Sequence, residues 1–150
     1  MRRLIRNGVV LLVTCSLTTL ASPAWAQPQK QSWATWVKRI SAEQVLYTTH
    51  AKRLLVDIGN SKAPGIVADA MNISGDSGAI AKLSNSPASV LNKMVYAWAV
   101  DMEAVAVYSL AYSKTQTQAH LKTVVASIYS CTAQQNAITK WYNTYTKTHS

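Results

Sequence analysis

Cysteine is scarce in this sequence of 150 residues, and its scarcity excludes a fold held together by disulfides. The two cysteines are Cys15 and Cys131, and Cys15 lies in a segment that we expect to be removed. Cys131 then stands alone, so the mature chain has no partner for an intrachain disulfide, even in an oxidising compartment. Cys131 lies in a helical pattern, which predicts a small buried side chain; intermolecular pairing or a reactive thiol is the alternative interpretation.

The sequence also lacks the spacing of a metal centre. Its three histidines are His50, His120 and His149. None of them is three or four residues from another histidine or from a useful cysteine, the separation that places two ligands on one face of a helix. We therefore predict no metal site and no cofactor.

One short motif imitates a catalytic site. Residues 75–78 spell GDSG, which resembles the segment around the nucleophilic serine of chymotrypsin-like proteases, and His50 and Asp57 precede Ser77 in that family's order. We reject this interpretation because that fold needs two β-barrels and a far longer chain. Residues 75–78 are instead expected to form a turn and a helix cap.

Acidic residues are few, since 15 lysines and arginines face only 6 aspartates and glutamates. Loss of three leader arginines leaves 12 basic and 6 acidic residues, a net charge of +6. The basic residues are mostly lysines and are scattered singly. This pattern predicts a solvated surface and no nucleic-acid site. Attraction to anionic lipid or a cell-wall polymer is the alternative, and membrane association is not predicted.

The first 26 residues have the three parts of a secretory signal peptide. Residues 1–6 carry three arginines, residues 9–20 are largely apolar, and Ala24 and Ala26 supply the small residues that signal peptidase requires. We expect cleavage near Ala26, a bacterial periplasmic or secreted location, and a single mature domain of residues 27–150.

A lipoprotein is the alternative interpretation of the leader. Cys15 would then be the lipidated residue, but Thr14 is a poor residue in front of it and the apolar run continues beyond it. A retained membrane anchor is disfavoured because the apolar run is short and contains threonines.

Apolar residues recur at helical spacing along most of the mature chain, and no alternating run indicates a strand. Ser32 can cap a first helix that runs to Ile58 and ends at Gly59. A last helix follows Thr117. With a central helix between them, we predict an all-α fold: an antiparallel bundle of three long helices.

The central helix is expected to begin with Ser86 as N-cap and Pro87 at the first helical position. From there to Tyr112 it is apolar on nearly every side, which is typical of a buried helix. Its acids, Asp101 and Glu103, point about 200° apart, so they do not form a paired acid and base. We expect one at the surface and the other as a buried polar group, and both argue against a membrane span. The candidate partners of a buried acid are Lys52, Arg53 and His50.

Glycine and proline gather between the first and central helices. Pro64 and the segment from Gly65 to Gly78 interrupt the regular pattern. This composition predicts a short-helix insertion, with helical turns near residues 65–71 and 77–83. The sequence assigns no role to this segment.

Aromatic residues gather at the start of the first helix and at the end of the last. In a bundle of three long helices these two helices run parallel, so the two groups would lie at opposite ends. Packing within the bundle is one interpretation, and a patch that binds a partner protein is the other. The residues are Trp33, Trp36, Trp141, Tyr142 and Tyr145.

These features predict a non-enzymatic interaction protein with a protein partner and an undetermined oligomeric state. Our first hypothesis is an accessory component of an envelope assembly such as a conjugation or type IV secretion system, an analogy of size and composition. One alternative is a periplasmic immunity protein that neutralises a toxin. Another is a small helical enzyme or ligand-binding protein, with Asp101 or Glu103 and His50 or His120 as acid and base.

Overall fold

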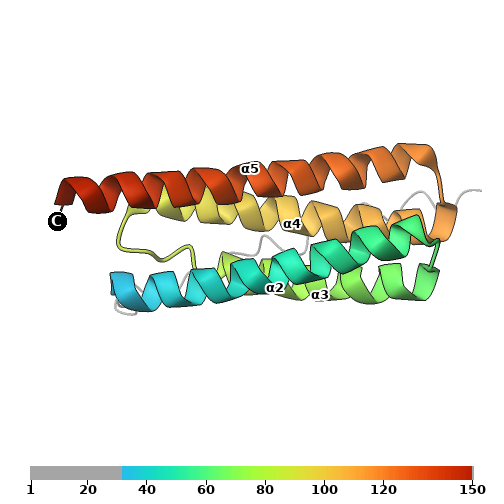
Figure 1. Ribbon diagram of the computed structural model, residues 1–150, viewed down its shortest axis with the longest axis horizontal. Coiled ribbons are helices and arrows are strands. Elements are labelled where there is room, and N and C mark those ends of the chain that lie inside the picture. Colours follow the sequence, from blue (N-terminus) through green and yellow to red (C-terminus); the bar gives the residue numbers. More distant parts are fainter. Residues whose placement is uncertain (1–31, 150) are drawn as a thin grey trace, which may run out of the picture.

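The computed structural model describes residues 32–149, and the predicted signal peptide and Cys15 lie outside this range. The described part is all helical, which confirms the predicted class. Each helix runs back beside the one before it (Figure 1). The arrangement is therefore an up-and-down bundle of helices joined by short loops. The helices are α2 (Trp33–Gly59), α3 (Ala63–Ala81), α4 (Ser89–Thr115) and α5 (Gln118–His149).

The segment rich in glycine and proline differs from the prediction, because α3 is one continuous helix of 19 residues. Pro64 lies in its first turn, where a proline costs no hydrogen bond. Ile66, Ile73 and Ile80 recur every seven residues and are fully buried. Burial of these three isoleucines outweighs the low helix propensity of the glycines, since tertiary packing supplies most helical stability in proteins.

The ends of α2 follow the sequence signals. Ser32 is its N-cap, and the hydroxyl oxygen of Ser32 accepts a hydrogen bond from the backbone N–H of Thr35. The helix ends at Gly59, and Asn60 is the C-cap. The positions of both ends were predicted, because capping depends on residues that are neighbours in the chain. The role of Gly59 was not: it is the last helical residue, and Ser61, with a φ of 54°, is the left-handed residue that follows the helix.

The start of α4 differs from the prediction. The helix begins at Ser89 with Ala88 as N-cap, two residues after the expected start. Ser86 is buried in the loop instead: its N–H donates to Asn92 Oδ1 at 2.6 Å and its hydroxyl donates to the carbonyl of Ala88 at 2.8 Å. The serine therefore stabilises the α3–α4 loop rather than capping the helix.

Two neighbouring helices cover part of α4. It packs against α3 on one side and α5 on the other, while α2 packs mainly against α3. Small residues bring α3 and α4 close, and the Ser77 hydroxyl donates to the carbonyl of Ala99 at 2.9 Å. The fully buried side chains that α4 contributes to the core are Leu91, Val95, Trp98, Met102 and Val105.

Two glycines of α3 are expected to weaken the fold. A Cβ atom at Gly75 or Gly78 would meet no other atom within 4 Å, and both residues are exposed. Glycine inside a helix is less favourable than alanine by about 0.5–1 kcal/mol. Gly75→Ala and Gly78→Ala should each raise the free energy of unfolding by about this amount, measured by urea denaturation.

Gly65→Ala is the matched comparison. A Cβ atom there would collide with the carboxylate of Asp57, which must turn away, so the gain in stability should be smaller than at Gly75 or Gly78. Equal effects at Gly65, Gly75 and Gly78 would contradict this account.

Candidate functional site

The predicted aromatic residues come together at one end of the bundle, which corrects the expectation that they lie at opposite ends. The ring centroid of Trp33 is 5.2 Å from that of Tyr145 and 6.4 Å from that of Trp141. The reason is topological. Because α3 is a full helix, α5 runs antiparallel to α2, and the start of α2 meets the end of α5 (Figure 1).

Burial favours a packing role for this aromatic cluster. Trp36 is only 1% exposed, and its Nε1–H donates to the carbonyl of Leu83 at 2.9 Å. The rings of Trp33, Trp141 and Tyr142 are half-buried against the core. The cluster therefore packs the end of α5 against the start of α2. Its participation in partner binding stays a prediction.

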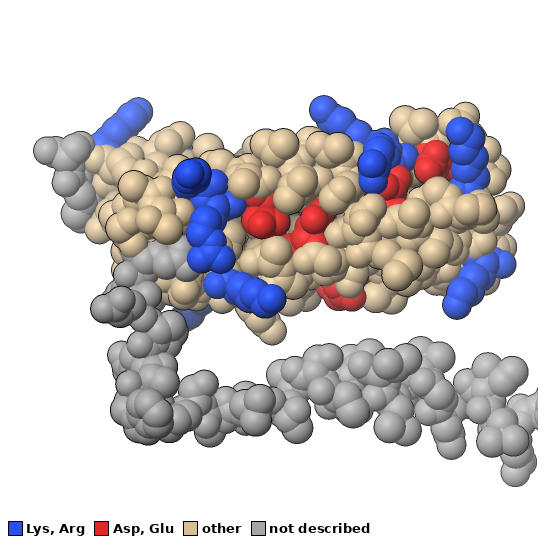
Figure 2. Space-filling model, turned by 90° about the horizontal axis from the view of Figure 1, so that it is seen from below, with Lys and Arg blue, Asp and Glu red and all other residues tan. Residues whose placement is uncertain are grey.

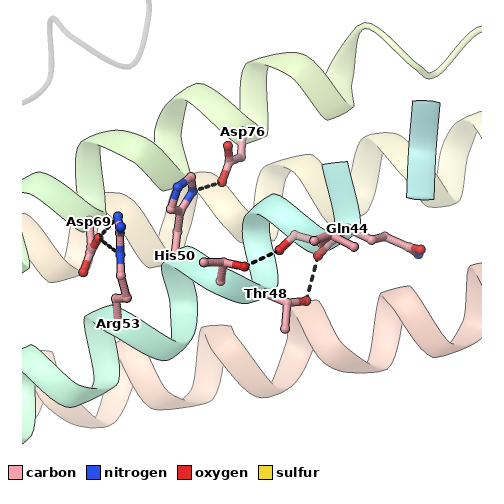
Figure 3. Close-up of polar contacts among 8 residues, drawn as sticks. Gln44, Thr48, His50, Arg53, Asp69 and Asp76 are labelled. Atoms are coloured by element: carbon pink, nitrogen blue, oxygen red, sulfur yellow. Dashed lines mark hydrogen bonds and ion pairs between the residues drawn. The ribbon is translucent and has the colours of Figure 1, made fainter. Parts of the chain in front are cut away.

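Two ion pairs join α2 to α3, and both acids are buried (Figure 3). His50 Nδ1 lies 2.5 Å from Asp76 Oδ2. The Nε and Nη2 atoms of Arg53 donate to Asp69 Oδ1 at 3.0 and 2.7 Å. The sequence pattern did not identify these contacts, because the acids lie in the segment that was expected to be irregular.

The same contacts exclude a protease-like catalytic site at residues 75–78. Residues 75–78 lie inside α3 rather than in a turn, which corrects that expectation. His50 pairs with Asp76, whereas Ser77 donates to a backbone carbonyl of α4. Asp57 packs over Gly65 near the start of α3. The expected trio of His50, Asp57 and Ser77 is therefore not brought together.

The two acids of α4 face different neighbours. Asp101 Oδ2 accepts a hydrogen bond from the Ser130 hydroxyl of α5 at 2.6 Å. The Ser74 hydroxyl of α3 lies 2.9 and 3.2 Å from the two carboxylate oxygens of the exposed Glu103. Asp101 therefore finds a serine, and not one of the expected bases, as its hydrogen-bond partner.

The histidines named for acid–base chemistry lie elsewhere. His50 is engaged by Asp76 between α2 and α3, and His120 Nδ1 lies 2.7 Å from the Thr115 hydroxyl at the α4–α5 turn. Among residues 32–149, no three histidine, cysteine or carboxylate side chains are close enough to hold a metal ion.

Two weakly acidic groups meet inside the bundle. Tyr47 of α2 lies beside Cys131 of α5, and burial raises the pKa of the Cys131 thiol to about 11. Burial also raises the pKa of Tyr47 far above its ordinary range. The Tyr47 hydroxyl has no hydrogen-bond partner of normal geometry among the described residues. Cys131 is thus a buried, protonated thiol, which favours the structural interpretation over the reactive one.

These shifts predict a loss of stability at alkaline pH. The unfolded chain loses the thiol proton near pH 8.5–9, whereas the folded chain keeps it to about pH 11. The folded state binds more protons in this window, so the free energy of unfolding should fall as pH rises through it. Cys131→Ala should flatten that fall in urea denaturation at pH 7, 9 and 10.5. A slope identical to that of the native chain would contradict the assignment.

The outer side of α4 carries the surface that the sequence pattern did not reveal. Five of the large apolar side chains exposed in residues 32–149 belong to this helix. A row of its residues at alternating spacings of three and four, the pattern of a coiled-coil seam, faces outward. We call this row the α4 seam: Lys93, Tyr96, Val100, Glu103, Val107, Leu110 and Lys114.

Three apolar members of the α4 seam are well exposed, and the fourth, Leu110, is half-buried. Tyr96, Val100 and Val107 expose 55, 53 and 52% of their surface. An outward face of a bundle helix is ordinarily polar, and a row that is apolar on both sides of a single acid is typical of a contact with another molecule. The contact of Glu103 with Ser74 places the seam beside α3.

The outer side of α3 continues this surface. Its exposed residues also follow spacings of three and four, and most are small or apolar. We call this row the α3 stripe, and the seam and stripe together the α3–α4 face. The stripe consists of Pro64, Ala68, Met71, Gly75, Gly78 and Lys82.

Lysines border the α3–α4 face at both ends. Because α3 and α4 are antiparallel, Lys62 and Lys114 lie at one end and Lys82 and Lys93 at the other. The ion pairs within residues 32–149 use only His50 and Arg53 as bases, so these lysines are available to a partner. On the adjoining side of the bundle, acidic and basic groups are interspersed (Figure 2).

The apolar character of α4 has a second interpretation. Of the described helices, α4 alone is long and apolar enough to cross a membrane, judged by length and composition. Its acids, however, are hydrogen-bonded to serines of neighbouring helices.

No family model, curated protein or solved structure matches the chain.

Proposed function

We propose that this chain is a non-enzymatic interaction protein that binds a partner protein through the α3–α4 face. The observation that carries the proposal is the α4 seam, in which Tyr96, Val100 and Val107 are more than half exposed along one line. The proposed setting is the bacterial envelope, with the protein periplasmic or secreted as an accessory component of a conjugation or type IV secretion assembly.

The remaining polar groups support binding rather than catalysis. Asp101 and Glu103 accept hydrogen bonds from serines on opposite sides of α4, and the imidazole of His50 is held by Asp76. These contacts stabilise helix packing. A general acid and base must instead converge on one substrate position.

Site-specific photocrosslinking tests the proposal. A photoreactive residue at Val100 or Val107 of the full chain, expressed in its native host, should give a discrete adduct with one envelope protein. The same residue at Ala133, which is exposed on α5, is the matched control and should give none.

Three outcomes would decide the matter. An adduct specific to Val100 and Val107 whose partner belongs to a secretion or conjugation assembly supports both the surface and the setting. An adduct with a toxin keeps the surface but replaces the setting with the immunity function. Equal labelling at Ala133, or no adduct at any position, would overturn the proposed function.

A further inference from the structure

The α3–α4 face has the residue spacing and charge to receive one more helix. We infer that its partner, if the proposed function holds, is an amphipathic helix with acidic residues at both ends, which lies along α3 and α4 as a fifth helix of the bundle. The inference rests on the proposed function and adds the chemistry of the partner.

The spacing of the α4 seam matches a helix rather than a strand or loop. Residues separated alternately by three and four form a straight row, into which the side chains of a facing helix fit. From Lys93 to Lys114 the row covers 22 residues, or about 31 Å at a rise of 1.5 Å for each step. A partner helix of about six turns would therefore cover it.

The α3 stripe allows this helix to approach closely. Gly75 and Gly78 face outward, and no atom of the described chain lies within 4 Å of a Cβ placed there. Their helix-weakening effect is therefore not explained by packing inside the bundle. Glycines on an outward helix face expose the backbone, which lets a second helix come nearer than larger side chains permit.

The charges determine which helix fits. Lys62 and Lys114 border one end of the face, and Lys82 and Lys93 border the other. Acidic residues near both ends of the partner would pair with them and fix its position along the face. Near the middle of the face, the Glu103 carboxylate accepts a hydrogen bond from Ser74. A hydrogen-bond donor or a positive charge at the middle of the partner helix would pair with this carboxylate.

The same charges disfavour two other occupants. A second copy would bring lysine-bordered faces together and place Glu103 against or near its equivalent. A bilayer would receive Glu103 in the middle of the apolar row, and an acidic residue inserted at the centre of a membrane helix costs roughly 2.5–3.5 kcal/mol. An acidic-ended protein helix satisfies both the lysines and Glu103.

Binding of two synthetic helical peptides to the purified mature chain tests the inference. Both peptides have 21 residues and the same leucine and alanine face. One has glutamates at both ends and a lysine in the middle, and the other has these charges reversed. Fluorescence anisotropy should show at least tenfold tighter binding of the acidic-ended peptide, and this preference should shrink at high salt.

Matched variants of the chain separate specific recognition from general attraction. Lys93→Glu with Lys114→Glu should weaken binding of the acidic-ended peptide about tenfold. Lys38→Glu with Lys140→Glu changes the net charge equally on exposed sites of α2 and α5 and should have little effect. Gly75→Ala should weaken binding while making the free protein more stable, a combination that a purely structural role of Gly75 would not produce.

The result is read together with the photocrosslinking. Equal affinity for the two peptides, or equal effects of the two charge variants, would overturn the inference, while adducts at Val100 would leave the proposed function standing. Binding to phosphatidylglycerol vesicles that is lost in Val100→Glu, or dimerisation in sedimentation that is lost in the same variant, would also overturn it. Absence of both peptide binding and adducts would remove inference and function together.

Discussion

Trp36→Ala is expected to lower the free energy of unfolding by about 3–5 kcal/mol, the range for truncating a fully buried aromatic side chain. Trp36 is 1% exposed and packs edge-on against Trp33 and beside Tyr142. Its loss would open a cavity where the start of α2 meets the end of α5. It would also leave the buried carbonyl of Leu83 without the donor that now lies 2.9 Å away. Urea denaturation followed by circular dichroism measures the effect.

A comparison of two tryptophans isolates the hydrogen bond from the packing. Trp98 is also fully buried, but its Nε1–H has no partner among the described residues. Trp36→Phe should therefore cost about 1–2 kcal/mol more than Trp98→Phe, because only the first substitution breaks a buried hydrogen bond. Equal costs would show that the Trp36–Leu83 contact contributes little.

Arg53→Met is expected to lower the free energy of unfolding by about 2–3 kcal/mol. The Asp69 side chain is only 4% exposed, and Arg53 supplies the charge that compensates it. Breaking a fully buried pair by removing one partner costs about 3–5 kcal/mol. The expected loss is smaller because the Arg53 side chain is 55% exposed, so water reaches the site.

Replacing Asp69 should lower the free energy of unfolding less than replacing Arg53. Asp69→Asn leaves a guanidinium that water can solvate, so it should cost about 1 kcal/mol or less. In a double-mutant cycle, Asp69→Ala should recover part of the loss caused by Arg53→Met, since no uncompensated buried carboxylate remains. Additive losses in the double variant would show that the two side chains act independently.

Local signals in the sequence were sufficient where the relevant residues are neighbours in the chain. Ser32 and Gly59 marked the ends of α2, and Ile40, Leu54 and Ile58 at helical spacing marked its buried face. Caps and periodicity depend on contacts within a few residues, so they can be recognised before the fold is known. The all-α class follows from the same signals.

Topology decided the position of the aromatic cluster. One additional full helix reverses the direction of every helix after it. Whether residues 63–81 form a helix therefore determined whether Trp33 lies beside Trp141 or at the opposite end of the bundle. Glycines and a proline argued against that helix, and burial of Ile66, Ile73 and Ile80 overrode them. Propensities do not include this burial energy.

The sequence alone determined the helical class, the ends of α2, the scarcity of disulfide and metal ligands, and the apolar character of the central helix. Only the tertiary structure decided which side of α4 its neighbours cover. A helix that is apolar nearly all round carries no internal sign of which face meets the core, because that choice belongs to the helices packed against it. The exposure of Tyr96, Val100 and Val107, and hence the proposed binding surface, follows from where α3 and α5 lie.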